Sequence, residues 1–198
     1  MKIGFQIAGI IAALCAGVVF LYSCNNPFST REPDPRNPGS TGAAIKPPNS
    51  PENVIDNLKA SFEGLSIQDY LDVFNEDFQF NPDSEDSLEY EQDFVYGWNY
   101  ENEMEFAQNF LQRNNFKPDI EGSPVEIFAS YSYKPGQDMY QYNYKIFINL
   151  SEKTETYEGY SWLFLREDTE GKWSVYRWVD FRLRKSSLSW GVLRAQHI

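Results

Sequence analysis

Hydrophobic residues follow two different periods in the two halves of the folded part of the chain. Between residues 50 and 112 the large apolar residues recur every three to four positions, which indicates amphipathic helices. From Val125 onward they recur at every second position, which indicates strands with one buried face. Helices first and long strands afterwards predict an α+β layer fold, in which helices pack on a meander of long antiparallel strands.

Two helices are predicted at the start of this region. Ser50 suits the N-cap and Pro51 the first turn of a helix that ends at Gly64. Ser66, with Asp69 three residues later, is typical of the start of a second, short helix.

A third helix is expected after Asn99, because this residue type caps helices and Glu103 in the first turn complements the helix dipole. Before it, residues 78–80 alternate as a strand does, and residues 94–98 are expected to form another short strand. The acidic residues 81–91 are expected to form a loop.

The second half predicts a meander of long strands. Residues 157–165 are apolar on both faces, as in a central strand. Trp173 and Trp178 are expected to be buried, on opposite faces or at a twist of one strand, since their spacing is odd. The expected strands cover residues 125–133, 140–150, 157–165 and 173–183, with a turn at 134–137 and a short edge segment at 189–193.

The N-terminus has the architecture of a signal peptide. Lys2 supplies a positive charge, and Ile3 to Leu21 form an apolar run that ends just before Cys24. The run is also about long enough to span a bilayer, so an uncleaved anchor is the alternative. Residues 25–50 are rich in proline and lack periodicity, which is typical of a linker that cannot order itself.

The sequence Leu21-Tyr22-Ser23-Cys24 resembles the lipobox of bacterial lipoproteins, although Tyr22 is bulkier than the usual residue there. The resemblance implies cleavage before Cys24 and attachment of fatty acyl chains such as palmitate to this cysteine. It divides the chain into a signal peptide (1–23), a lipidated tether (24–50) and a folded domain (51–198). Asn25 differs from the Asp of an inner-membrane retention signal, which favours the outer membrane of the cell envelope.

Composition excludes several classes of function. The formal net charge is −12, which disfavours nucleic acid and anionic lipid headgroups as partners. The only cysteines are Cys15 and Cys24, and the only histidine is His197. The domain therefore lacks the residues for disulfides, zinc-thiolate sites and histidine-based catalytic triads. No cofactor is expected.

The acidic stretch has one feature of a calcium loop, because Asn81, Asp83 and Glu85 alternate as loop ligands do. However, Asp86 occupies the position of the turn glycine, and Gln92 replaces the closing glutamate. No metal site is therefore expected.

Two segments resemble the NTF2-like, or SnoaL-like, superfamily. The first runs from Glu52–Ala60 through Tyr70–Phe74 to Phe78–Phe80, and the second is Gly171–Asp180. The resemblance implies a cone, in which a bent sheet wraps a cavity and the opening helices plug it. This fold hosts isomerases, dehydratases, cyclases and non-catalytic modules, so the resemblance does not specify a function.

Enzymes of this superfamily place an Asp, Glu or His inside the cone, and the resemblance therefore implies Asp180 as the candidate catalytic base. Asp180 follows Trp178 by two residues, so both are expected on one face, where burial would raise the carboxyl pKa. The alternative is an ordinary ion pair between Asp180 and Arg177, Arg182 or Arg184.

Six aromatic residues are candidates to line a ligand pocket, and core packing explains them equally well. They are Tyr140, Tyr142, Tyr144, Tyr160, Trp162 and Trp178. Two hypotheses follow. In the first, a membrane-tethered, non-catalytic domain binds a small apolar ligand or an envelope protein. In the second, it is an isomerase or dehydratase with a carboxylate base.

The state of the cone discriminates between these hypotheses. A cone filled by its own aromatic side chains favours binding without catalysis, and an empty cone with a buried, unpaired carboxylate favours an enzyme. The sequence also leaves a homodimer open.

Overall fold

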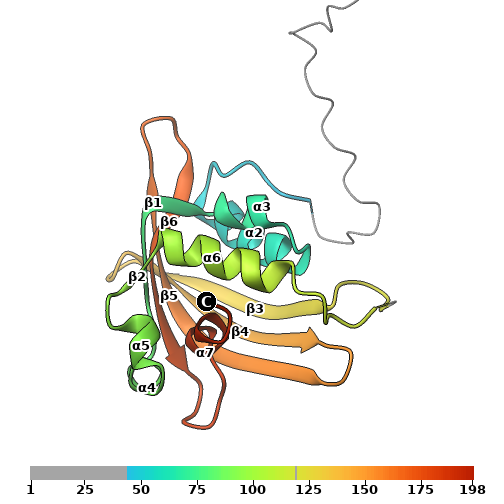
Figure 1. Ribbon diagram of the computed structural model, residues 1–198. Helices are drawn as coiled ribbons and strands as arrows, with labels where there is room; N and C mark the ends of the chain where they lie inside the picture. Colours follow the sequence, from blue (N-terminus) through green and yellow to red (C-terminus); the bar gives the residue numbers. More distant parts are fainter. Residues whose placement is uncertain (1–43, 119) are drawn as a thin grey trace, which may run out of the picture. The chain divides into compact units, whose positions relative to one another are not determined.

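The computed structural model describes residues 44–118 and 120–198, so the predicted signal peptide, Cys24 and most of the tether lie outside the described residues. The described part is an α+β fold, as predicted (Figure 1). Its elements, in chain order, are α2 (Pro51–Glu63), α3 (Ile67–Leu71), β1 (Phe74–Asn81), α4 (Ser84–Glu89), α5 (Glu91–Phe94), β2 (Trp98–Asn99), α6 (Tyr100–Leu111), β3 (Val125–Lys134), β4 (Met139–Asn149), β5 (Thr154–Glu167), β6 (Trp173–Arg182) and α7 (Trp190–Ala195).

The strands form one six-stranded, curled and unclosed sheet in the order β2-β1-β6-β5-β4-β3. The long strands β3 to β6 pair antiparallel, as expected. The predicted antiparallel pairing has one exception, because β1 pairs with β6 in parallel. The two strands are far apart in sequence, so no tight hairpin obliges them to run in opposite directions.

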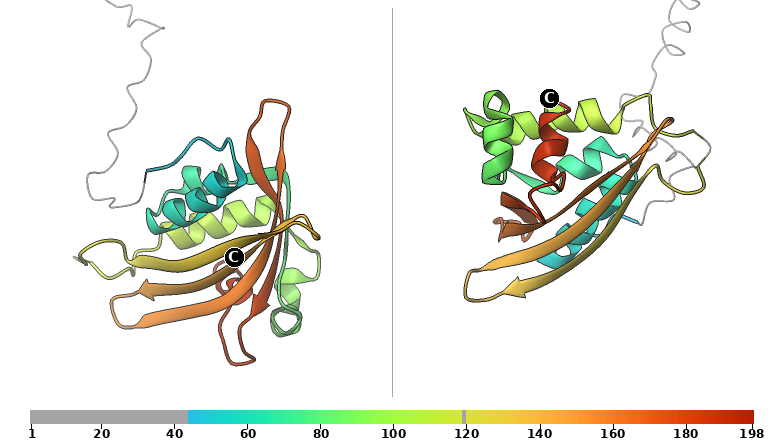
Figure 2. Two further views of the ribbon diagram at one scale, coloured as in Figure 1. Left: turned by 180° about the vertical axis from the view of Figure 1, so that it is seen from behind. Right: turned by 90° about the horizontal axis from the view of Figure 1, so that it is seen from below.

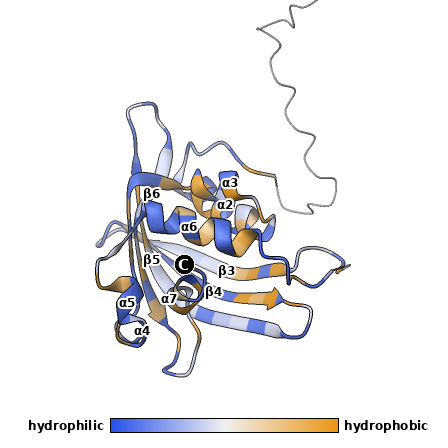
Figure 3. Cartoon of the chain, viewed as in Figure 1, coloured by the Kyte–Doolittle hydropathy of each residue, from blue (hydrophilic) through white to orange (hydrophobic). Residues whose placement is uncertain are grey.

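The helices α2, α3 and α6 lie together over one face of the curled sheet (Figures 1 and 2). The predicted caps are present: Ser50 accepts a hydrogen bond from the Asn53 backbone, and Ser66 accepts one from Asp69. Apolar and polar residues alternate along α2 and α6 (Figure 3), and Phe62 of α2 stacks on Phe110 of α6 at 5.1 Å between ring centroids. Stacked aromatic rings thus join the helices above the sheet.

Three short segments differ from the sequence expectations. The expected loop at 81–91 contains α4, capped by Asp83, and the expected strand at 94–98 begins inside α5. The expected edge segment at 189–193 is the helix α7, because the Ser189 side chain accepts a hydrogen bond from the Val192 backbone and caps it.

Trp178 is fully buried and Trp173 is half-buried against the core. Residues with odd spacing lie on opposite faces of a regular strand. Here, however, the pairing of β5 with β6 is irregular between Phe164 and Leu165. A bulge of this kind shifts the side-chain alternation by one residue, so both tryptophans reach the core side of the sheet.

Gly159 on β5 is the position where the sheet tolerates no side chain. A Cβ atom there would collide with the Phe181 carbonyl oxygen and the Tyr144 hydroxyl group, whereas a Cβ atom at Gly136 would meet open space. We predict that Gly159→Ala lowers the free energy of unfolding by about 1–3 kcal/mol, because it overpacks the sheet. Urea unfolding measures this effect, and equal stability of Gly159→Ala and the control Gly136→Ala would contradict it.

Candidate functional site

Asp180 lies at the centre of a buried polar network. Its side chain is fully buried on β6 and accepts hydrogen bonds from the Ser161 hydroxyl at 2.7 Å and the Tyr144 hydroxyl at 3.0 Å. The backbone N–H of Gly191, in the first turn of α7, donates to its other oxygen at 3.2 Å. Burial outweighs these donors and raises the pKa of the Asp180 carboxyl to about 7.

The expected ion pair between Asp180 and a nearby arginine is not present among the described residues. Arg182 instead pairs with Asp86 and Glu89 of the α4 region, and Arg177 donates to the Asn81 side chain at 3.3 Å. The spacing of Asp180 and Arg182 suggested a shared face, but the Arg182 side chain turns toward α4 at the end of the strand. The carboxyl group of Asp180 is therefore held by neutral donors.

A second buried network, which the sequence analysis missed, joins α7 to α6. Arg194 and Glu103 are both fully buried and form a bidentate ion pair, with nitrogen to oxygen distances of 2.7 and 2.9 Å. Glu103 also accepts hydrogen bonds from the Tyr70 hydroxyl and from the Trp98 indole N–H, the latter at 2.7 Å. Every formal charge in this network thus has a partner.

Aromatic rings surround the guanidinium group of Arg194. Its central carbon lies 4.1 Å from the ring centroid of Phe80 and 4.5 Å from that of Trp178, with Phe106 and Trp190 slightly farther away. Such cation–π contacts are strongest where water is excluded, as it is here. The sequence signal for this site was an arginine within the apolar run Trp190–Ala195, at a position that helical periodicity turns inward.

Trp190 fills the space between the helices and the sheet. Its ring centroid lies 4.8 Å from that of Phe62 on α2, 5.2 Å from Trp178 on β6 and 5.9 Å from Tyr144 on β4. Trp190 and Arg194 are both fully buried. The interior of the cone is therefore occupied by α7 itself (Figure 1).

The six pocket candidates do not converge on one cavity. Tyr142, Tyr144 and Trp178 belong to the buried core. Tyr160 and Trp162 lie on the opposite face of β5, where each ring centroid is 4.7 Å from that of Phe181. Tyr140 is buried at the end of β4, and its hydroxyl donates to Glu52 of α2 at 2.6 Å.

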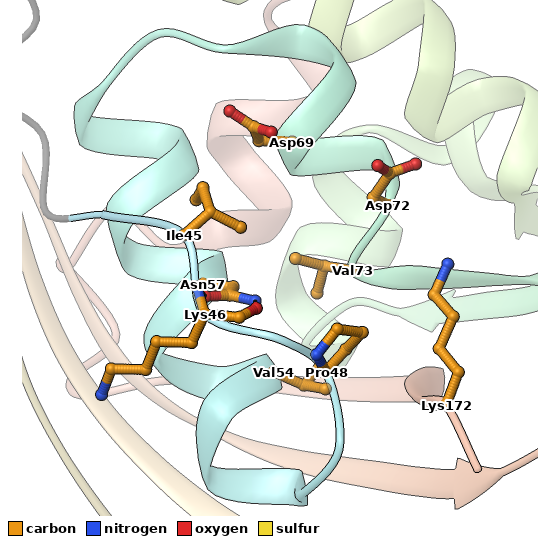
Figure 4. Close-up of a pocket in the computed structure, with 9 residues that line it drawn as sticks. All are labelled: Ile45, Lys46, Pro48, Val54, Asn57, Asp69, Asp72, Val73 and Lys172. Carbon is orange, nitrogen blue, oxygen red and sulfur yellow. Dashed lines mark hydrogen bonds between the residues drawn. The ribbon is translucent and has the colours of Figure 1, made fainter.

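A cavity of about 330 Å³ lies outside the cone, where residues 45–48 pass over α2 and α3 (Figure 4). Its apolar wall includes Val54 and Val73, and Asp69, Asp72 and Lys172 add charged groups. The side chain of Asn57 holds the 45–48 segment in place, since it exchanges two hydrogen bonds of 2.8 Å with the Lys46 backbone. This cavity combines apolar walls and polar groups as small-molecule sites do.

Among residues 44–118 and 120–198, no three histidine, cysteine, aspartate or glutamate side chains gather closely enough to hold a metal ion. Within the same ranges, no helix has the length and apolar character needed to cross a bilayer.

No family model and no curated protein matches the chain. Similar solved structures include a protein of unknown function from Mycobacterium tuberculosis (12% identity, 68% of this chain and 70% of that one, TM-score 0.48). Others are a cystatin-like protein of unknown function from Nostoc punctiforme (12%, 69% and 90%, TM-score 0.43) and a ketosteroid isomerase-like protein from Erwinia carotovora atroseptica (8%, 67% and 93%, TM-score 0.44). These likenesses say nothing about the activity of this chain.

The stability of the domain should depend on the protonation of Asp180. The pKa of the Asp180 carboxyl is about 7 in the folded chain, whereas its ordinary value is 3.8. Stability should therefore fall as the pH rises from about 4 to about 7, by on the order of 2–4 kcal/mol.

Asp180→Asn should lack this part of the pH dependence, because the amide mimics the protonated acid. Urea unfolding across this pH range gives the free energy of unfolding of the wild type and of Asp180→Asn. The contributions of the other titrating groups are the same in both proteins and cancel in the difference. Parallel stability curves for the two proteins would show that the Asp180 carboxyl titrates normally.

Removing one partner of the Arg194–Glu103 pair should be costly. We predict that Arg194→Met lowers the free energy of unfolding by about 3–5 kcal/mol, because it leaves the Glu103 carboxylate buried without its cation. The double variant Arg194→Met/Glu103→Gln should lose less than the sum of the single variants. Strictly additive losses in urea unfolding would indicate that the two side chains do not interact.

Proposed function

We propose that this protein is a lipoprotein of the bacterial cell envelope, held in the outer membrane by acyl chains on Cys24, and that its domain acts by binding another envelope protein rather than by catalysis. The sequence from Leu21 to Cys24 supports the anchor, and the proline-rich segment 25–50 supports a tether that keeps the domain away from the headgroups.

The filled cone carries the proposal of a non-catalytic role. Trp190 of α7 packs on Trp178, and the adjacent Gly191 N–H donates to the fully buried Asp180 side chain. A catalytic base must reach the proton that it abstracts, directly or through one water. The oxygens of Asp180 instead accept hydrogen bonds from the Ser161 hydroxyl, the Tyr144 hydroxyl and the backbone N–H of Gly191.

A surface suited to a protein partner is present at α4 and α5. Leu88, Val95 and Tyr96 are 79%, 57% and 98% exposed, although all three are large and apolar. Exposed apolar surface of this kind marks interaction sites in folded domains.

A small apolar ligand, the alternative to a protein partner, has a candidate site in the cavity beside the 45–48 segment (Figure 4).

One observation favours an enzyme as the second candidate function. The pKa of Asp180, raised to about 7 by burial, suits a general acid or base near neutral pH. An isomerase or dehydratase using this carboxyl would require α7 to leave the cone, so that substrate could reach Asp180.

The anchor is tested by Cys24→Ala. We expect this variant to accumulate as an unprocessed precursor that takes up no radioactive fatty acid, because the acylated thiol is absent. The wild-type chain, expressed in parallel, provides the reference for labelling and for the processed size. Equal labelling of the two chains would rule out lipidation at Cys24.

The binding role is tested by photo-crosslinking in living cells. A photoreactive residue at Tyr96 or Leu88 should capture one and the same envelope protein, whereas the exposed position Glu105 on α6 should not. Capture at Tyr96 should also be lost in the Cys24→Ala chain, because the unprocessed precursor is not delivered to the outer membrane. No common product from Tyr96 and Leu88 would contradict the proposed partner surface.

A further inference from the structure

The strand β3 forms one edge of the sheet and is unusually long for an edge. It contains ten residues, and within residues 44–118 and 120–198 its only partner strand is β4. The opposite edge strand, β2, has two residues. A long edge presents a row of backbone groups to which another strand can bind, and folded proteins normally shorten, charge or cover such edges.

The hydrogen bonds of β3 show which backbone groups point outward. The Ile127 N–H donates to the Glu63 side chain of α2 at 2.7 Å, and the Val125 N–H donates to Ser123 at 3.1 Å, so neither points toward β4. Successive residues of a strand alternate in this respect. The outward backbone groups farther along β3 are therefore those of Ala129, Tyr131 and Tyr133, and no described residue forms a hydrogen bond with them.

Both ends of this outward row are closed. Glu63 of α2 uses the Ile127 N–H at one end. At the other end the next outward position is Pro135, which has no N–H to donate. The open row of three residues is symmetric about Tyr131.

The open row is also uncovered on both faces of the sheet. All five residues from Ala129 to Tyr133 are exposed, and Phe128 beside them is 60% exposed. The hydroxyl of Tyr131 donates to Asp56 and that of Tyr133 to Asp138, which fixes both rings next to the edge. The residues from Phe128 to Lys134 include no acid, although the whole chain has a formal net charge of −12.

We propose that β3 pairs with β3 of a second copy of this chain, antiparallel and with the two-fold axis at Tyr131. In this register Ala129 lies opposite Tyr133 of the second copy, so that a small side chain faces a large one. Phe128 lies opposite Lys134 of the second copy, where a cation can pack on an aromatic ring. The same contacts occur twice, as a two-fold interface requires.

The register also agrees with the closed ends of the row. Ile127 would lie opposite Pro135 of the second copy, at a position where Glu63 already uses the Ile127 N–H and the proline offers none. Pairing therefore ends at these two positions, because neither residue has a free backbone N–H to donate. The proposal concerns self-association and does not depend on the anchor at Cys24 or on the α4–α5 surface.

Sedimentation velocity of the full chain in mild detergent tests this dimer with Tyr131→Pro. The proline removes an outward N–H and leaves the β3–β4 hydrogen bonds in place, and edge positions of this kind tolerate proline. The control Tyr131→Val keeps the N–H. We expect wild type and Tyr131→Val to sediment as dimers and Tyr131→Pro as a monomer. A monomeric wild type, a dimeric Tyr131→Pro, or equal loss of the dimer in both variants would overturn the proposal.

Disulfide trapping tests the same axis in a chain whose backbone is intact. Antiparallel pairing would place the two Tyr131 Cα atoms about 5.5 Å apart, which suits a disulfide. Oxidised Tyr131→Cys should therefore migrate as a covalent dimer, whereas Tyr96→Cys should not, and the wild type reports any background from Cys15 and Cys24. Absence of the Tyr131→Cys dimer would overturn the proposal. This is also the result expected if another segment or another protein covers this edge.

Discussion

The buried ion pair between Arg194 and Glu103 is the contact on which the interior of this domain depends. Removing two charges from water costs several kcal/mol for each, and good geometry with further hydrogen bonds is needed to offset that cost. Here Glu103 also accepts from Trp98, and Arg194 packs between aromatic rings such as Phe80. These requirements are met only when α7 is inside the cone, so the pair fixes α7 to α6 and places Trp190 in the core.

The same helix completes the hydrogen bonds of the second polar network. The Gly191 N–H donates to Asp180, and the Trp190 N–H donates to the Tyr144 hydroxyl, which in turn donates to Asp180. The polar groups that could serve a substrate are therefore satisfied by the C-terminal segment of the chain. This arrangement links the fold to the proposed role, because it leaves the surfaces of the domain, rather than its interior, available for binding.

Local signals in the sequence were sufficient to predict most of the helices and strands, but they did not predict α7. Caps such as Ser50 and the period-two alternation after Val125 predicted the main helices and strands. A six-residue helix is too short to be stable alone, so only its tertiary contacts decide its conformation. The position of two of the six pocket candidates could not be predicted for a related reason. Because β5 is apolar on both faces, its pattern does not show that Tyr160 and Trp162 lie on the side of the sheet away from Tyr144 of β4.

Hydrogen exchange at the backbone amides of α7 tests most directly whether the cone is filled in the native protein. The Leu193 and Gln196 amides donate within this helix, and their exchange reports its opening. If the buried ion pair holds α7 in place, these amides exchange with the same free energy of opening as the central amides of β4. Rapid exchange in α7 while β4 stays protected would show that the helix leaves the cone readily, and would contradict this account.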